Sequence, residues 1–378
     1  MKRPVRALRR AAAAAILCAS ALSAAQVHAQ AAGAGAAAAA ADPTAAAILA
    51  RIREIRAMPR ADNAAAVGAQ RVELNAAWRF FGNYRDDAIP LLRRELAAEV
   101  RAARPSPQLL LDAACFLAFY GADADQPLVL QAALAMPPDA ALDGPQLFRL
   151  MHAAAASRDT RLLPMIDRAF LRQSVTLPVP QQGSAIDETG LRVLLYGQFG
   201  AAGERHLAGM LRDEALAKPV LDVLLLVGSP DSAAAVLPLL RSADMEVFAR
   251  AVNVLLRVGG PPGRQALLAL NPQDLTSEAA TYFASIREQL ARPPSSQAGQ
   301  GALADAQVRR LLDTLEANQG RYEGVDPAAI VQSRLPRQEL LERLGRIRER
   351  SAARATNEAL ADIETTTALL NAVRYRDQ

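Results

Sequence analysis

Few side chains in this sequence could perform chemistry together. Two of its three histidines lie beyond residue 30, His152 and His206, and they lack the spacing of a pair of metal ligands. The sequence has no H-E-x-x-H, C-x-x-C or G-x-S-x-G motif, the patterns of zinc hydrolases, thiol redox enzymes and serine hydrolases. We therefore predict no catalytic residue, no cofactor and no metal site.

The remaining reactive side chains are isolated from one another. Cys115 lies in the apolar run LLLDAACFLAFYG, and we interpret it as a buried small hydrophobic residue rather than a reactive thiol. Lys218 precedes Pro219, which excludes the lysine of a phosphate-binding loop. The three glycines in 197–203 have a spacing seen in phosphate-binding turns, but no strand precedes them, so we interpret this segment as a turn between helices.

One aromatic stretch is a candidate for binding. Four of the 16 aromatic residues fall within WRFFGNY at 78–84, and arginines are interleaved with them. Trp, Tyr and Arg are the usual anchors of protein interfaces. Consecutive aromatic residues on a helix cannot all face inward, so core packing and a binding anchor both remain open. The candidate partner-binding residues are Trp78, Arg79, Phe81, Tyr84 and Arg85.

The elements that carry these residues recur along the chain. An apolar helix ends in bulky residues and a small one, a short polar turn follows, and a second apolar helix begins. Such turns recur at intervals of 28 to 43 residues, at Gly82, Gly121, Ser157, Gly200, Gly228 and Gly259. We expect the glycines to take the left-handed conformation that ends many helices. Self-similarity at this period is typical of stacked helical hairpins.

The clearest repeat is VLLLVGSPDSAAAVLPLL at 223–240, which aligns with VLLRVGGPPGRQALLAL at 254–270. Between them, Asp244, Val247 and Arg250 stand near the places of an acidic turn and of the Val-Arg pair that opens the next helix. This stretch resembles the HEAT-like repeats, including the subclass first seen in phycobilin lyases. The resemblance implies an all-α fold, an α-solenoid of stacked antiparallel helix pairs, over 43–291.

Prolines recur in the second helix of each pair. Pro90 and Pro164 lie close to the start of such a helix, where few backbone hydrogen bonds are lost. Pro238 lies deeper, and we expect it to kink its helix. We interpret these prolines as determinants of helix shape and not of chemistry.

The first 29 residues have the pattern of a secretory signal peptide. Five basic residues precede the apolar run at 11–25, and VHA at 27–29 predicts cleavage after Ala29. Of 43 basic residues, 38 then remain against 39 acidic ones, so the high pI gives no support to nucleic-acid binding. The excess of Ala and Arg over Lys indicates GC-rich bacterial coding. We predict a periplasmic protein with no membrane span after cleavage, and a disordered Ala-rich leader at 30–42.

Three further segments depart from the repeat. The proline-containing stretch at 174–187 is an insertion, either functional or merely tolerated. Pro, Ser and Gly predict a linker at 292–304, followed by a helical C-terminal region at 305–378. Apolar residues at 340, 344, 347, 360, 363 and 370 predict a stripe that must be covered by the end of the solenoid, a second copy or a partner.

These observations favour a non-enzymatic periplasmic scaffold or adaptor, which binds an unknown protein partner of the cell envelope through its helical repeats. Two alternatives remain open. One is a lyase- or isomerase-like enzyme of the HEAT-like class, and the other is a carrier of an apolar envelope ligand.

Overall fold

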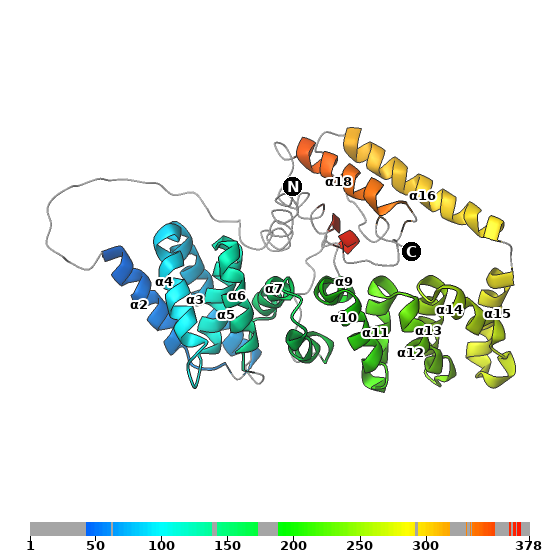
Figure 1. Cartoon of the computed structure of the whole chain (residues 1–378), viewed down its shortest axis with the longest axis horizontal. Coiled ribbons are helices and arrows are strands. Elements are labelled where there is room, and N and C mark those ends of the chain that lie inside the picture. Colours follow the sequence, from blue (N-terminus) through cyan, green and yellow to red (C-terminus); the bar gives the residue numbers. More distant parts are fainter. Residues whose placement is uncertain are drawn as a thin grey trace. The chain divides into compact units, whose positions relative to one another are not determined.

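The computed structural model describes residues 43–61, 63–137, 142–172, 188–291, 294–317 and 335–351. It also describes positions 330, 333, 363, 366, 367 and 369–371. Helices account for most of these residues, and no strand occurs among them. The prediction of an all-α fold is therefore confirmed (Figure 1). The predicted signal peptide, the Ala-rich leader and the 174–187 insertion lie outside the described residues.

The described chain divides into two compact units, one over 43–172 and one over 188–371. The region of 43–291, which we expected to be one repeat domain, thus contains a division near residue 178. This division lies within the predicted insertion at 174–187.

The first unit is built around α5. Its elements are α2 (Pro43–Ala57), α3 (Ala64–Asn83), α4 (Arg85–Glu99), α5 (Pro107–Tyr120), η1 (Asp123–Asp125), α6 (Gln126–Leu134), α7 (Gly144–Ala155), η2 (Thr160–Leu162), α8 (Leu163–Ile166) and the π-helix η3 (Asp167–Leu171). Helix α5 packs against α2, α4, α6 and α7, and residues 108–117 along it are all buried. A mostly apolar sequence, interrupted here by Gln108 and Asp112, suits a helix that is covered on every side.

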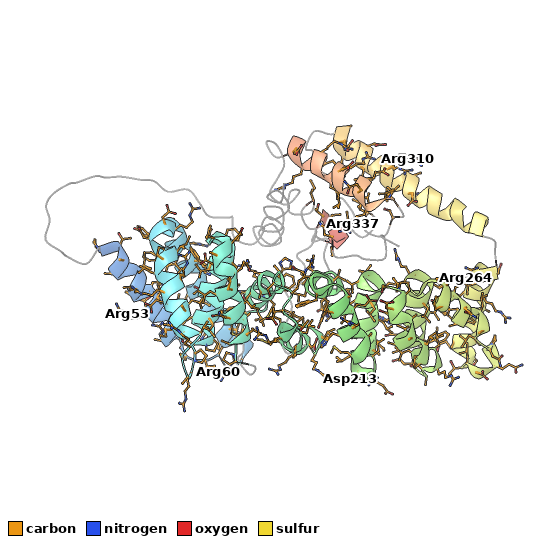
Figure 2. All side chains as sticks on the ribbon, viewed as in Figure 1. Arg53, Arg60, Asp213, Arg264, Arg310 and Arg337 are labelled. Atoms are coloured by element: carbon orange, nitrogen blue, oxygen red, sulfur yellow. The ribbon has the colours of Figure 1, made fainter. Side chains whose placement is uncertain are left out.

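In the second unit, alternate α-helices pack against one another. Its first part comprises α9 (Glu188–Tyr196), η4 (Gly197–Phe199), α10 (Ala201–Met210), α11 (Glu214–Val227), η5 (Pro230–Ser232), α12 (Ala233–Val236), η6 (Leu237–Arg241), α13 (Met245–Arg257), α14 (Gly260–Ala269), η7 (Pro272–Asp274) and α15 (Ser277–Ala291). Helix α11 contacts both α9 and α13, and α13 also contacts α15. Arg264, labelled in Figure 2, donates from Nη2 to the carbonyl of Leu290 at 2.7 Å and ties α14 to the end of α15.

The C-terminal region forms a helical pair, α16 (Pro294–Ala317) and α18 (Arg337–Ser351), which contact each other. The described stripe residues Leu340, Leu344, Ile347, Ile363 and Leu370 are all buried, and Leu360 lies outside the described residues. Helix α16 begins at Pro294, so most of the segment predicted to be a linker is helical instead. Proline is tolerated in the first turn of a helix because its missing N–H would have no partner there. Composition alone therefore misassigned 294–304.

Several helices begin at side chains that accept hydrogen bonds from the first turn. Asn63 accepts from the N–H of Ala66 at 2.9 Å, and Asp244 accepts from the N–H of Glu246 at 2.8 Å. Ser106, Asp143 and Asp213 cap α5, α7 and α11 in the same way. Each cap satisfies one of the N–H groups that a helix leaves unpaired at its start.

The turn glycines do not follow the expected left-handed pattern. Gly121 and Gly228 have φ of −73° and −69° and are extended, and among the aligned turn glycines only Gly200 has a positive φ, of 57°. Their requirement is steric: a Cβ at Gly121 would lie 2.4 Å from the carbonyl oxygen of Leu117, and one at Gly228 would lie 2.4 Å from that of Leu224. The same close approach recurs in both units.

The prolines match the prediction only in part. Pro164 lies in the first turn of α8, as expected. Pro90 was expected close to the start of its helix but lies inside α4, where a proline removes one helical hydrogen bond. At Pro238 the chain changes from α-helix in α12 to 3₁₀-helix in η6. A missing N–H and the bulk of the ring both weaken the α-helical pattern at that point.

Buried carboxylates hold the turns between helices. Glu99 accepts from the N–H of Ser106 at 2.6 Å and from Nε of Arg56 at 2.7 Å. Asp125 accepts from the N–H of Ala122 at 2.7 Å and from two nitrogens of Arg93, at 2.5 and 3.0 Å. Desolvation is offset in each case by a cation and a backbone donor.

Candidate functional site

The aromatic stretch predicted from the sequence is part of a larger cluster that joins α3 to α5. We define the aromatic cluster as Trp78, Phe80, Phe81, Tyr84, Phe116, Phe119 and Tyr120. The ring of Trp78 on α3 meets those of Phe116 and Phe119 on α5 edge to face, with centroids 5.3 and 6.5 Å apart. Such pairs stabilise the contact between their helices beyond the area they bury.

One edge of the cluster faces solvent. Tyr84 is 43% exposed and Phe119 is 41% exposed, and Trp78, Phe80 and Tyr120 are half-buried. Few large apolar side chains in the described residues are this exposed. The exposed edge therefore offers large rings that are held in place by the buried members.

Phe81 does not belong to this exposed edge. It was a candidate partner-binding residue, but its side chain is fully buried and packs on Phe116 with centroids 5.8 Å apart. We correct that assignment, since Phe81 lies on the inward face of α3 and cannot touch a partner. The sequence analysis missed Phe116, Phe119 and Tyr120, which lie about one helical hairpin away. The FLAFY run at 116–120 was a signal that could have found them.

Two arginines flank the exposed rings. Arg79 is exposed and forms no ion pair with another described residue. Nε of Arg85 lies 3.4 Å from Oδ1 of the adjacent Asp86, and the Arg85 side chain is 54% exposed. Exposed pairs of this kind contribute little to stability, so both guanidinium groups are available to a partner.

A buried acid lies beneath the cluster. Nε1 of Trp78 donates to Oδ1 of Asp112 at 2.5 Å, and Asp112 has no exposed surface. Burial raises the pKa of Asp112 to about 8, against the opposing effects of the Trp78 hydrogen bond and the charge of Arg51. A carboxyl group in such surroundings is neutral at pH 7.

The other candidate residues do not converge. His152 stacks on Phe148 with ring centroids 5.9 Å apart, and burial lowers its pKa to about 4. Sγ of Cys115 is buried and donates to the carbonyl of Gln146 at 3.3 Å, and burial raises the pKa of this thiol to about 12. Nζ of Lys218 lies 2.9 Å from carboxylate oxygens of both Asp244 and Glu246. The described part of the chain holds no group of three side chains suited to a metal ion.

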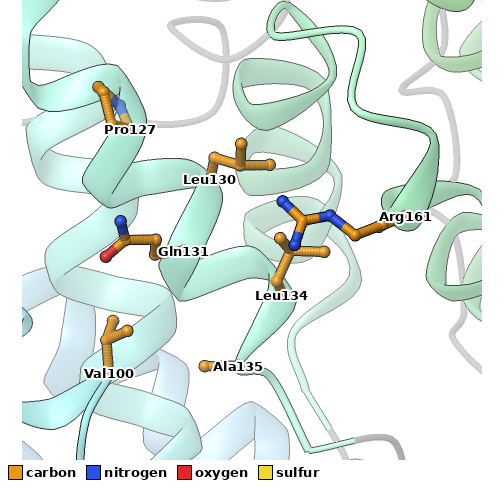
Figure 3. Close-up of a pocket in the computed structure, with 7 residues that line it drawn as sticks. All are labelled: Val100, Pro127, Leu130, Gln131, Leu134, Ala135 and Arg161. Atoms are coloured by element: carbon orange, nitrogen blue, oxygen red, sulfur yellow. The ribbon is translucent and has the colours of Figure 1, made fainter.

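Two shallow depressions lie on the first unit. One, of about 490 Å³, is lined by side chains of α6, by Val100 and by Arg161 of η2 (Figure 3). The other, of about 540 Å³, lies between the ends of α2 and α4 and contains Arg56, Arg60 and Arg104 together with Glu95 and Glu99. Both are open, and neither contains the buried acid or His152.

Comparisons with known proteins returned no match: no family model, no curated protein and no solved structure is similar to this chain. Within the residues that the structure describes, no helix is both long and apolar enough to cross a bilayer.

Proposed function

We propose that this protein is a non-enzymatic scaffold or adaptor that binds a protein partner through the exposed edge of the aromatic cluster. The observation that carries the proposal is the exposure of Tyr84 and Phe119, two members of one aromatic cluster, together with the exposure of Arg79 on the same helix as Trp78. Interface anchors are enriched in aromatic residues and arginine, and they work best when the free protein already holds them in place. The ring contacts within the cluster provide that support.

We further propose that the helices are stacked as HEAT-like pairs in an α-solenoid. Two features support this architecture. Helix α11 contacts α9 and α13, as successive repeats do, and the close approach of a turn glycine to a carbonyl four residues earlier recurs at Gly121 and Gly228. Stacks of this kind present extended surfaces, which suits an adaptor.

The proposed setting is the periplasm, after removal of residues 1–29. It rests on the basic start, the short apolar run and the VHA sequence before residue 30. The partner would then be another protein of the cell envelope.

Two other functions make different demands on the structure. A lyase or isomerase needs acid and base groups that face a common substrate, and a carrier needs a deep apolar cavity. In the described residues, the half-buried His152 and the buried Asp112 both lie outside the two depressions, and the depressions themselves are shallow. No specific observation favours either function over the adaptor.

Cross-linking in the cell envelope tests the proposal. The full chain would be expressed with a photo-reactive residue in place of Asn83, which is exposed at the end of α3, and cross-linked partners would be identified by mass spectrometry. We expect one dominant adduct that is lost in the double variant Tyr84→Ala, Phe119→Ala. The matched control is Leu268→Ala, which removes a side chain of comparable exposure, 48%, in the second unit. An adduct that survives the double variant would refute the binding role of this surface.

A further inference from the structure

Asp112 is an ionisable residue in the middle of the apolar helix α5. Its neighbours from 108 to 117 are all buried, and its own side chain is 0% exposed. Oδ1 accepts the indole hydrogen of Trp78, whereas Oδ2 has no hydrogen-bond partner among the described residues. An ionised carboxylate in such a place would be costly, since its second oxygen would lack any donor.

Two buried amide oxygens on α5 and α7 also have no hydrogen-bond partner among the described residues. Gln108 donates from Nε2 to Gln70 at 3.0 Å, but its buried Oε1 has no partner, and the same holds for Oε1 of Gln146. Gln108 lies four residues before Asp112 and therefore on the same face of α5. Cys115 lies three residues after Asp112 and donates to the carbonyl of Gln146, which brings the start of α7 to this face.

We propose that Asp112 is a proton-binding site that controls the contact between α3 and α5. In the neutral form, the carboxyl group donates its proton from Oδ2 to one of the unpaired amide oxygens, while Oδ1 still accepts from Trp78. Protonation converts Oδ2 of Asp112 from a hydrogen-bond acceptor into a donor.

The charged groups of the packed elements do not neutralise Asp112. On α2, Arg51 attracts it but bonds to Glu54 at 2.6 Å and to the carbonyl of Glu73 at 3.0 Å. On α7, Arg149 and His152 each have another interaction, although the buried Nε of Arg149 has no hydrogen-bond partner within the described part of the chain. Oδ1 of Asp143, just before α7, lies 3.6 Å from Nη1 of Arg71. Helix α6 contains no titratable side chain. On α4, Arg93, Arg94, Glu95 and Glu99 pair with Asp125, with one another or with Arg56.

Loss of the proton has a structural consequence. The resulting carboxylate needs water or a second donor, and the ring of Trp78, which bonds to Asp112, is only half-buried. Trp78 also belongs to the aromatic cluster. Deprotonation is therefore expected to loosen α3 from α5 and to displace the exposed rings. The consequence for partner binding rests on the proposed function, but the proton site itself does not.

The chain contains a single tryptophan, so its fluorescence reports directly on this site. We would follow the emission of the full chain between pH 5 and pH 10, together with quenching by acrylamide. The expected result is one titration with a midpoint near pH 8, with stronger quenching on its alkaline side. In Asp112→Asn the amide keeps the acceptor for Trp78 and supplies a permanent donor, so the titration should be lost. Asp87→Asn, which removes an exposed carboxylate of the same unit, should retain it.

Two outcomes would overturn the proposal: an emission that does not titrate in the unmodified protein, or a titration that persists in Asp112→Asn. Because the measurement needs no partner, it is independent of cross-linking. A titration without any envelope adduct would refute the adaptor function and leave the proton site standing. A dominant adduct without a titration would refute the proton site and leave the adaptor function standing.

Discussion

Oε1 of Glu204 accepts both the backbone N–H and the hydroxyl of Ser229, at 2.7 and 2.6 Å, and it also accepts the hydroxyl of Ser232 at 2.6 Å. All three residues are buried. One carboxylate oxygen on α10 thus anchors the turn that precedes α12. This contact connects residues 25 and 28 positions apart and ties the turn before α12 to α10.

Replacement of Glu204 by alanine should destabilise the second unit strongly. Three buried donors would lose their acceptor, and each such loss costs about 1–3 kcal/mol. We expect the free energy of unfolding to fall by roughly 3 kcal/mol or more, measured by urea denaturation followed by circular dichroism. Glu214→Ala, which removes an exposed carboxylate of the same unit, should change it by less than about 1 kcal/mol. Equal effects of the two substitutions would contradict this account.

The stability of the first unit should depend on pH through two opposing groups. Between about pH 4 and pH 6.5, unfolding allows His152 to bind a proton, so its contribution to stability rises with pH. Between about pH 4 and pH 8, Asp112 keeps its proton in the folded state and releases it on unfolding. Its contribution to stability therefore falls as the pH rises. The two slopes should nearly cancel up to pH 6.5, and the fall due to Asp112 should continue alone to about pH 8.

The variant His152→Gln separates the pH dependence due to Asp112 from that due to His152. Without the histidine, the denaturation midpoint of the first unit should fall steadily from about pH 4 to pH 8, as followed by the fluorescence of Trp78. A midpoint that still stays flat below pH 6.5 would show that His152 does not change its protonation on unfolding.

The thiol of Cys115 should be inert in the folded protein. Burial raises its pKa to about 12, so the thiolate is scarce at pH 8, and the group is 3% exposed. In a Cys18→Ser background, labelling by a thiol-specific chromogenic reagent should proceed only as fast as the first unit unfolds. Rapid stoichiometric labelling without denaturant would place Cys115 at the surface and refute its burial.

The pair of α16 and α18 should depend on Arg343. This side chain is 8% exposed and bonds to Asp313 and to Glu316, both on α16, with a distance of 3.2 Å to the latter. Arg343→Met keeps the aliphatic length but leaves the Glu316 carboxylate without one of its two arginines. Amide hydrogen exchange should accelerate in both helices and not in α9–α15. Unchanged exchange in α16 would show that apolar packing alone holds the pair. Gln338→Met serves as the control, because this exposed side chain lies in the same helix and bonds to Glu342 within it.

The sequence by itself determined the helical class, because a local pattern of apolar spacing, caps and breakers carries it. Asp244 could be placed in an acidic turn, and the structure shows it as the N-cap of α13. Pro238 marks the change from α- to 3₁₀-helix for a reason that needs no tertiary contact. The start of α2 at Pro43 is also a local feature, since proline suits the first turn of a helix.

Only the tertiary structure decided which aromatic residues are anchors and which are core. Phe81 and Tyr84 are three positions apart in one aromatic run, yet the first is fully buried and the second is 43% exposed, because α5 covers only one side of α3. The pairing of Trp78 with Asp112 joins positions 34 apart and leaves no local trace. The protonation of Asp112 follows from that packing, since it is the exclusion of water by neighbouring helices that raises its pKa.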